Sequence, residues 1–300
     1  MQLTGFLNII NVVAPQPNTP LRAVILYSAG HLGSAILFNR LVKSPDITLC
    51  AIIKTPALPY THKGKQSLRH HLKRTGWRFG WLMLWQRIVQ TILYGIHLLF
   101  PARTRAILPG WLLAKRHQIP VYFTRSINSR TFRKQLRELA PDIVISAFCN
   151  QILKPEIIAI PRLGTLNVHP GWLPAYRGAM SYFWVLHNGE DQAGVSIHWI
   201  DEGIDTGTLL ARRKISLKTG MTQQMVMIRS ALAGSILLKH LLHMLVTGKT
   251  PASIKEESPQ ESSAYFPAPD HAAFDGYFNQ HRFFRIRDTW RIITGARFLR

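Results

Sequence analysis

The fold is decided by the stretch Gly164-Thr165-Leu166-Asn167-Val168-His169-Pro170-Gly171-Trp172-Leu173-Pro174-Ala175-Tyr176-Arg177-Gly178, together with Asp201-Glu202-Gly203-Ile204-Asp205-Thr206-Gly207. These segments place an amide (Asn167), an imidazole (His169) and a carboxylate (Asp205) at the ends of apolar runs that are typical of strands. In a parallel α/β sheet, the carboxyl ends of the strands carry the active site. We therefore expect the three side chains to meet at that edge of a sheet.

The chain before this stretch alternates between strands and helices. Apolar runs without polar interruption, as in strands buried on both faces, precede helical patterns at 129–139 and 155–159. Five strands are predicted in this part, at 23–27, 48–53, 119–123, 141–148 and 164–168. The alternation predicts an α/β fold with a Rossmann-like, mostly parallel sheet. We place this domain at residues 21–250, with a helical insertion at 62–116 and a short irregular C-terminal extension at 251–300.

A glycine-containing turn follows the first strand. Gly30 and His31 lie where a helix begins, so backbone amides there could hold a phosphate group of a substrate. The alternative is a tight strand-to-helix turn that binds nothing. The second strand ends in Lys54 and lacks the acidic residue that holds ribose hydroxyls in dinucleotide-binding folds. This argues against a nicotinamide cofactor.

The composition indicates a basic, folded protein. Lys and Arg total 37 against 15 acidic residues, for a formal charge of +22. Such a surface favours phosphate esters, RNA or acidic lipid head groups as partners, although a solvated basic surface without a specific partner is the plain alternative. Cys50 and Cys149 lack CxxC spacing, so we expect reduced thiols and a cytoplasmic protein. The apolar run 6–14 is too short to span a bilayer.

The insertion combines a basic run at 62–74 with an amphipathic helix at 77–100. Gln86, Arg87, Gln90 and His97 fall on one side of this helix, opposite a broad apolar arc. Tryptophans with basic flanks are typical of a helix lying in the plane of an anionic membrane, at the inner face of the membrane for a cytoplasmic protein. Arg87 argues against a full span. The alternative is packing on the same domain or on a second subunit as a homodimer.

The residue types of the central stretch suit acyl transfer. Asn167 and His169 are two positions apart, so in a strand their side chains point the same way and could both donate to a developing oxyanion. Asp205 could orient the imidazole and favour its protonated form. No serine or cysteine lies in a nucleophile motif such as GxSxG, so transfer without a covalent enzyme intermediate is expected. Each residue alone is a weak signal, since such residues are common in loops.

Taken together, residues 164–178, the segment Gly194-Val195-Ser196-Ile197-His198 and residues 201–207 resemble the folate-dependent formyltransferase family. The similarity is close over about residues 142–217 and looser over the first strand and helix. It implies that 10-formyltetrahydrofolate donates a formyl group to a primary amine. Asn167 and His169 would then stabilise the oxyanion, while Asp205 would hold the histidine and help to move the amine proton.

The resemblance also implies where the substrates lie. The folate would lie beside Leu173 and Pro174 and along the backbone of residues 200–205, and the residues implied there are Ile200, Asp201, Gly203 and Ile204. Tyr176 and Arg177 could shape the acceptor entrance, or form a surface turn. Gly171 and Trp172 stand where the family usually has serine and leucine, so Trp172 could narrow the donor pocket. No metal is expected, because His240 and His243 have no carboxylate or cysteine beside them in the sequence.

The C-terminal part bears on the acceptor. Strands at 195–199 and 208–215, a long apolar helix at 221–246 and a short helix at 272–284 are predicted. Too few alternating strands follow to build the C-terminal β-barrel of methionyl-tRNA formyltransferases, so tRNA is disfavoured as a partner. A small-molecule amine, phosphorylated or nucleotide-linked, is expected instead. The alternatives are a non-catalytic RNA- or membrane-binding protein and a formyltetrahydrofolate hydrolase.

Overall fold

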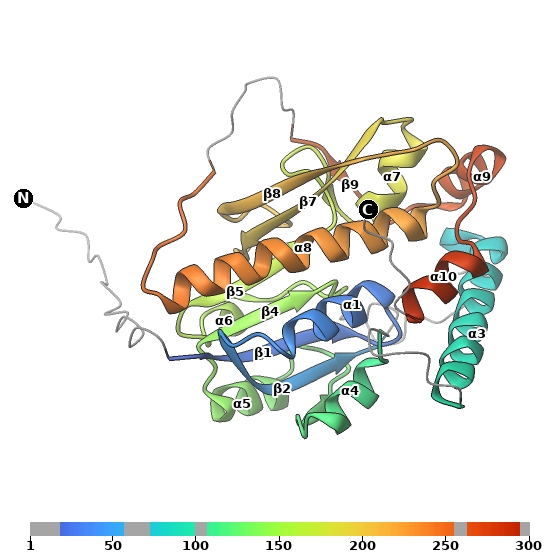
Figure 1. Cartoon of the computed structure of the whole chain (residues 1–300). Coiled ribbons are helices and arrows are strands. Elements are labelled where there is room, and N and C mark those ends of the chain that lie inside the picture. The colour runs from blue at the N-terminus through green and yellow to red at the C-terminus, as the bar shows by residue number, and fades with distance from the viewer. Residues whose placement is uncertain (1–18, 57–72, 100–106, 255–262, 295–300) are drawn as a thin grey trace, which may run out of the picture.

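The computed structural model describes residues 19–56, 73–99, 107–254 and 263–294, and it is built on one seven-stranded sheet (Figure 1). The strand order is β3-β2-β1-β4-β5-β7-β8, in which β1 to β5 run parallel and β7 runs antiparallel to both of its neighbours, β5 and β8. The bounds are β1 (Leu21–Ser28), β2 (Ile47–Thr55), β3 (Val121–Phe123), β4 (Ile143–Ala147), β5 (Gly164–His169), β7 (Gln192–Trp199) and β8 (Leu209–Ser216). The Rossmann-like, mostly parallel sheet predicted from the sequence is therefore confirmed.

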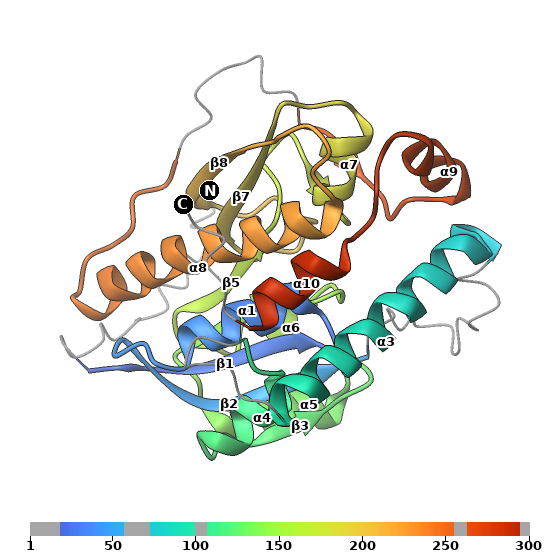
Figure 2. The same cartoon turned by 45° about the vertical axis from the view of Figure 1, so that its right-hand side comes forward.

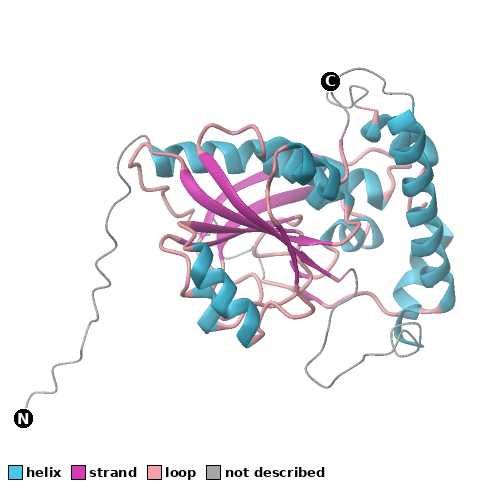
Figure 3. Ribbon diagram, turned by 90° about the horizontal axis from the view of Figure 1, so that it is seen from below, coloured by secondary structure: helices cyan, strands magenta, loops and turns pink. Residues whose placement is uncertain are grey.

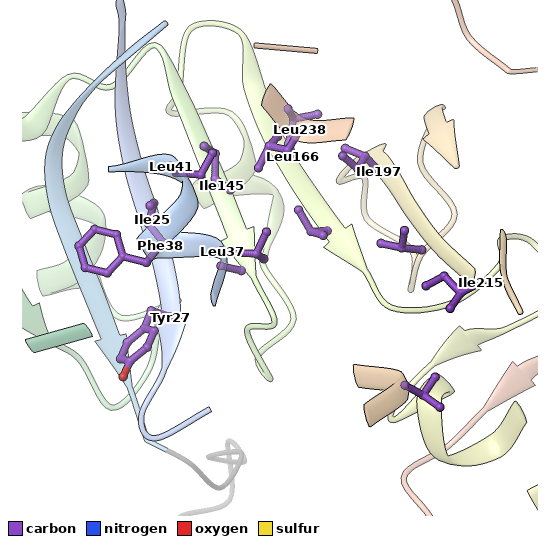
Figure 4. Close-up of a cluster of buried hydrophobic side chains, with 14 of the residues drawn as sticks. Ile25, Tyr27, Leu37, Phe38, Leu41, Ile145, Leu166, Ile197, Ile215 and Leu238 are labelled. Carbon is purple, nitrogen blue, oxygen red and sulfur yellow. The ribbon is translucent and has the colours of Figure 1, made fainter. Parts of the chain in front are cut away.

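Helices cover both faces of the sheet (Figure 3). Alternate residues of β1 point to opposite sides: Ile25 belongs to one apolar cluster and Leu26 to another. The Ile25 face is covered by α1 (Leu32–Leu41), α4 (Gly110–Arg116) and α8 (Gln223–Val246), and Figure 4 shows Leu37, Leu41 and Leu238 packed there. The Leu26 face is covered by α5 (Arg130–Leu139) and α6 (Pro155–Ile158). Burial on both faces explains the unbroken apolar runs of the central strands.

The helix α8 is the core helix of this arrangement. Among the described residues it alone is long and apolar enough to cross a membrane by length and composition, yet 67% of its most apolar window is buried inside the protein. It begins at Gln223, where the side chain of Thr222 accepts a hydrogen bond from the Met225 N–H at 3.2 Å. Its contacts with α1, β5, β7 and β8 account for that burial.

The extension after residue 250 contains more regular structure than the sequence predicted. In addition to α9 (His271–Gln280), it forms β9 (Tyr265–Phe266) and α10 (Ile286–Ile293). β9 pairs in parallel with β6 (Arg177–Gly178), and α9 packs Tyr277 against Phe183 of α7 (Ser181–His187), with ring centroids 4.6 Å apart. The extension therefore pairs with and packs against the segment that follows β5. Residues 255–262 and 295–300 lie outside the described residues.

The insertion forms the helix α3 (Trp77–Leu99), which lies along one side of the molecule, outside the layers of the sheet (Figures 1 and 2). Its first turns are held by Phe79, whose ring stacks on Phe274 of α9 at 4.0 Å. Gln86, on the predicted polar side, is buried, whereas much of the predicted apolar arc is exposed. The basic run at 62–72, together with Arg103 and Arg105, lies outside the described residues, as does the N-terminal run 6–14.

Candidate active site

The candidate site forms at the end of β5, where the parallel part of the sheet meets its antiparallel part. Asn167 and His169 point to the same side of β5, as the two-residue period of a strand requires. The antiparallel neighbour β7 places His198 directly opposite Asn167. Asp205 lies on the turn between β7 and β8 and has a φ of +53°, a left-handed conformation that aspartate tolerates. The structure thus brings the three predicted side chains together.

The carboxylate of Asp205 is the centre of the cluster. Its Oδ1 accepts a hydrogen bond from Asn167 Nδ2 at 3.2 Å, and its Oδ2 accepts one from the Gly178 N–H at 2.8 Å. The rings of His169 and His198 each approach it to 3.4 Å. Burial by itself raises the pKa of Asp205, but the His169 and His198 rings and the Gly178 N–H outweigh burial and hold the pKa well below its ordinary value. Asp205 is therefore a carboxylate at neutral pH.

His169 lies beneath this carboxylate and is almost fully buried. Its Nε2 is 2.6 Å from the carbonyl oxygen of Tyr176 and 3.1 Å from Ser181 Oγ, whereas its Nδ1 is 3.4 Å from Asp205 Oδ2. The short contact to a carbonyl assigns the ring proton to Nε2, because a carbonyl can only accept. Burial lowers the pKa of His169 and outweighs the opposing effects of the Asp205 carboxylate and the Tyr176 carbonyl.

This tautomer leaves two hydrogen-bond acceptors facing each other. In the neutral ring, the Nδ1 lone pair of His169 faces the Oδ2 atom of Asp205 at 3.4 Å, with no proton between the two atoms. A proton delivered to this gap would convert a contact between two acceptors into a charge-assisted hydrogen bond. The pair is therefore arranged to take up one proton.

Asn167 supplies N–H donors at the same point. Its Nδ2 lies 3.2 Å from Asp205 Oδ1 and 3.1 Å from His198 Nε2. The Nδ1 atom of His198 is 2.7 Å from the carbonyl oxygen of Trp199, so this nitrogen carries the proton and Nε2 accepts from the amide. Both N–H bonds of Asn167 are thus engaged within the protein. A substrate carbonyl would have to replace His198 or Asp205 as acceptor.

The residues predicted for the donor side form the loops around this cluster. Leu173 is buried and joined to β7 and β8, because its N–H donates to Ser196 Oγ at 3.1 Å and its carbonyl accepts from Arg212 Nη1 at 2.9 Å. The bond between Leu173 and Pro174 is cis. Asp201 Oδ1 accepts from the Gly203 N–H at 3.1 Å and from Thr206 Oγ1 at 2.7 Å, which closes the turn that carries Asp205.

Two further contacts hold the backbone that leads into Asp205. The Ile200 N–H donates to the Thr165 carbonyl at 2.8 Å, which ties the start of the turn to β5. The Ile204 carbonyl, immediately before Asp205, accepts from Arg177 Nε at 2.9 Å. The backbone on the N-terminal side of Asp205 is therefore held at both of these points.

The residues predicted for the acceptor fall into two groups. Tyr176 and Arg177 adjoin the cluster: the Tyr176 carbonyl contacts His169, and Arg177 reaches both Ile204 and the Ser263 hydroxyl. Gly30 and His31 follow β1, which is separated from β5 by β4. Two spacings between neighbouring strands place the carboxyl ends of β1 and β5 about 10 Å apart. Within the described residues, the structure gives no direct contact between Gly30 or His31 and the cluster.

Three contributors were not predicted from the sequence, namely His198, Ser181 and the N–H of Gly178. His198 carried a signal, since it ends the apolar run 194–198 in the same way that His169 ends β5. Ser181 takes the position beside His169 Nε2, and a Cβ added at Gly171 would lie 2.6 Å from that nitrogen. The glycine at 171 is therefore matched to the position of the histidine.

Trp172 lies against β7 and β8. Its Cβ is close to Gly194, and the guanidinium of Arg212 stands 4.1 Å from its ring centroid. This is a cation–π contact that holds the ring on the sheet.

No group of three or more His, Cys, Asp or Glu side chains with the arrangement of a metal site occurs in the part of the chain that the structure describes.

Known proteins are similar to the central part of this chain. Residues 102–242 match the family model described as formyl transferase. Methionyl-tRNA formyltransferase of Clostridioides difficile is 34% identical over 155 residues, which are 52% of this chain and 49% of that protein. The bifunctional polymyxin resistance protein ArnA of Wigglesworthia glossinidia brevipalpis is 34% identical over 45% of this chain and 20% of its own length. The chain spans about half the length of the curated methionyl-tRNA formyltransferases that it matches.

Solved structures share the fold at low sequence identity. Glycinamide ribonucleotide transformylase 1 from Symbiobacterium toebii has a TM-score of 0.53 at 15% identity, covering 76% of this chain and 89% of that chain. Phosphoribosylglycinamide formyltransferase from Coxiella burnetii has a TM-score of 0.52 at 19% identity, covering 83% of this chain and 100% of that chain. The same α/β sheet therefore underlies both proteins and this chain.

One sequence-based expectation is wrong. tRNA was disfavoured as a partner because no C-terminal β-barrel is visible in the sequence, yet several curated relatives are methionyl-tRNA formyltransferases. The similarity to them spans about half of their length, so the missing barrel says nothing about the acceptor. The family model and the curated relatives together show that residues 102–242 carry a formyl transferase domain.

Proposed function

We propose that this protein transfers the formyl group of 10-formyltetrahydrofolate to a primary amine. The observation that carries the proposal is the buried pair of acceptors formed by His169 Nδ1 and Asp205 Oδ2, 3.4 Å apart and next to the amide of Asn167. Formyl transfer to an amine requires a group that accepts the amine proton and a donor for the carbonyl oxygen. The formyl transferase domain supports the same chemistry.

The pair of Asp205 and His169 receives the proton that the amine loses when it bonds to the formyl carbon, and returns it to the folate nitrogen as the bond between that nitrogen and the formyl carbon breaks. Asp205 remains ionised, since it accepts hydrogen bonds from the Gly178 N–H and from the amide of Asn167. A carboxylate with a low pKa is a weak base alone, but the adjacent Nδ1 of His169 can share the proton. The shared proton turns the repulsion between two acceptors into a hydrogen bond, which favours the step.

Asn167 holds the carbonyl oxygen of the formyl group. One N–H of the amide continues to donate to Asp205, and the other, which faces His198 Nε2 at 3.1 Å, donates to the substrate oxygen instead. Hydrogen bonds between catalytic side chains commonly rearrange in this way when the substrate binds. A donor of this kind is worth roughly 2.7–4 kcal/mol to the transition state.

We place the folate along the turn that carries Asp205. The backbone of Ile200, Asp201, Gly203 and Ile204 leads into Asp205, and Leu173 and Pro174 lie in the segment that follows β5. When bound, the folate supplies the activated formyl group. The turn contributes by holding it against Asn167, since the contacts from Thr165 and Arg177 fix the backbone that leads into Asp205.

The acceptor carries its amine on a phosphate-bearing molecule. Gly30 and His31 open α1 at the carboxyl end of β1, and the formal charge of +22 favours anions. Their distance of about 10 Å from β5 suits a molecule whose phosphate and amine are several bonds apart. Aminoacyl-tRNA and a nucleotide-linked amino sugar share this chemistry.

The test is an assay of 10-formyltetrahydrofolate consumption with three additions: methionyl-tRNA, a nucleotide-linked amino sugar, and no acceptor. We expect tetrahydrofolate to form only with an acceptor, and the acceptor to gain one formyl group by mass spectrometry. The His169→Ala variant should lose this activity by orders of magnitude. Equal turnover without an acceptor, with release of formate, would identify a hydrolase. Near-normal turnover of the His169→Ala variant would refute the proposal.

A further inference from the structure

Within the part of the chain that the structure describes, nothing covers an apolar stripe on the outer face of α3. Along the 23 residues of the helix, the stripe consists of Trp77, Trp81, Leu84, Ile88, Ile92 and Leu99, whose exposed fractions lie between 38% and 76%. An α-helix places residues three, four and seven apart on one face, so these side chains form a continuous band. Such a band is larger than the scattered apolar residues of ordinary protein surfaces.

The orientation of α3 is fixed by its inner face. Phe79 stacks on Phe274, and Val89 is buried. Leu93 and Tyr94 pack on the cluster that contains Ile292 of α10. Gln86 is also buried, so part of the polar side of the helix faces the protein while the apolar side faces outward. This arrangement is the reverse of an amphipathic helix on a protein surrounded only by water.

The sequence that contains the stripe is basic. The sequence contains no Asp or Glu between Asp46 and Glu138, whereas the same interval contains 17 Lys and Arg. Next to α3, the helix α10 exposes Trp290 together with Arg287 and Arg291. Tryptophan and basic side chains around an apolar band are typical of helices that lie in the interface of an anionic membrane.

We propose that α3 lies in the plane of a membrane that carries anionic lipids, with its outer face in the acyl boundary and the basic residues at the head groups. The charge decides between this surface and a second copy of the chain, because a copy would bring an equally positive surface against the first. RNA would be attracted by the charge, but it offers no apolar partner for the leucine and isoleucine side chains.

This placement turns the carboxyl ends of β1 and β4, near which we place the substrates, toward the membrane. Arg87 of α3 reaches back to the turn after β1, where its Nη1 lies 3.4 Å from the carbonyl oxygen of Ala29. The helix lies on the side of the molecule toward which β1 and β4 run (Figure 1). The carboxyl ends of these strands therefore open beside the proposed lipid contact.

The test is flotation of the full chain with vesicles of phosphatidylcholine alone or with added phosphatidylglycerol. We expect at least tenfold stronger binding to the anionic vesicles, weakened by added salt. The Ile88→Gln/Ile92→Gln double variant should bind at least tenfold more weakly than the wild type. The matched control is Val121→Gln/Ile236→Gln, which changes two similarly exposed aliphatic residues of β3 and α8 (43% and 53%, against 38% and 53% for Ile88 and Ile92) and should bind like the wild type.

Each alternative has its own outcome. No binding to vesicles, equal binding of the two double variants, or binding only to RNA would overturn the proposal. A dimer that becomes a monomer in the Ile88→Gln/Ile92→Gln variant, without vesicle binding by the wild type, would assign the stripe to a second copy and also overturn it. Formyl transfer to a soluble acceptor should be unchanged in the Ile88→Gln/Ile92→Gln variant, which keeps this test independent of the proposed reaction.

Discussion

Replacing Asp205 with asparagine tests the cluster with the smallest change of shape. Asparagine is nearly isosteric with aspartate and tolerates the φ of +53° at this position. The substitution removes the negative charge and exchanges one acceptor for a donor. If the amide oxygen takes the place of Oδ2, it keeps the Gly178 N–H, but the new NH2 then faces Asn167 Nδ2. In the other orientation, the new NH2 faces the Gly178 N–H.

Either orientation therefore leaves one buried donor without an acceptor. The cost of such a donor is about 1–3 kcal/mol, so the free energy of unfolding of the Asp205→Asn variant should fall by that amount. The catalytic effect is larger, because the pair with His169 Nδ1 can no longer share the amine proton. We expect kcat/KM to fall by a factor of roughly 10²–10⁴, as for loss of an oxyanion donor or of the carboxylate that orients a catalytic histidine.

The assay measures formyl transfer and urea unfolding on the same preparations. The control is Asp142→Asn, which also removes a carboxylate that accepts a backbone N–H, from Arg22 at 2.8 Å, and pairs with Arg162 at 2.7 Å. Asp142 precedes β4, at the opposite edge of the sheet. The control should lose stability and keep its kcat/KM. An Asp205→Asn variant within threefold of wild-type kcat/KM would refute the role of the carboxylate.

Three further predictions follow from single contacts. The Gly171→Ala variant should lose activity and about 1–3 kcal/mol of stability in urea unfolding, because the added Cβ lies 2.6 Å from His169 Nε2. The control is Gly95→Ala, whose added Cβ meets nothing within 4 Å and which should be neutral or stabilising. Equal behaviour of the two variants would count against this packing. The Ser181→Ala variant should lower kcat/KM about fivefold, the equivalent of roughly 1 kcal/mol for one hydrogen bond, with little change in KM; an unchanged kcat would remove Ser181 from the site. Burial lowers the pKa of His31 to about 4, so on acidification the unfolded chain binds a proton at this residue near pH 6.5, before the folded chain does. Between pH 7 and pH 4, the free energy of unfolding should therefore fall by roughly 3 kcal/mol more in the wild type than in the His31→Asn variant. Equal losses in the two proteins would contradict the burial of the ring.

Part of the site was predictable because strands impose a period of two. Asn167 and His169 had to point the same way once their segment was identified as a strand, and its carboxyl end fixed the edge of the sheet. The partners of these residues were harder to foresee. His198 faces Asn167 only because β7 is antiparallel to β5 in one register, and registers are set by the tertiary structure.

The orientation of α3 could not be predicted for a similar reason. The periodicity of its sequence separates a polar side from an apolar side, but it does not say which side meets the protein. That choice is made by aromatic residues from the distant extension, with Phe274 against Phe79, and by α10. The pairing of β6 with β9 is likewise a contact between two-residue strands, too short to carry a periodic signal.

The central claim is that the cluster around Asp205 moves a formyl group from folate to an amine. The most direct measurement follows isotope-labelled formyl carbon of 10-formyltetrahydrofolate in a single turnover, with methionyl-tRNA and a nucleotide-linked amino sugar as acceptors, for the wild type and the Asp205→Asn variant. We predict labelled formamide on the amine of one acceptor with the wild type, and at least a hundredfold slower appearance of it with the variant. Label found only in formate, or at the same rate in both proteins, would contradict the account.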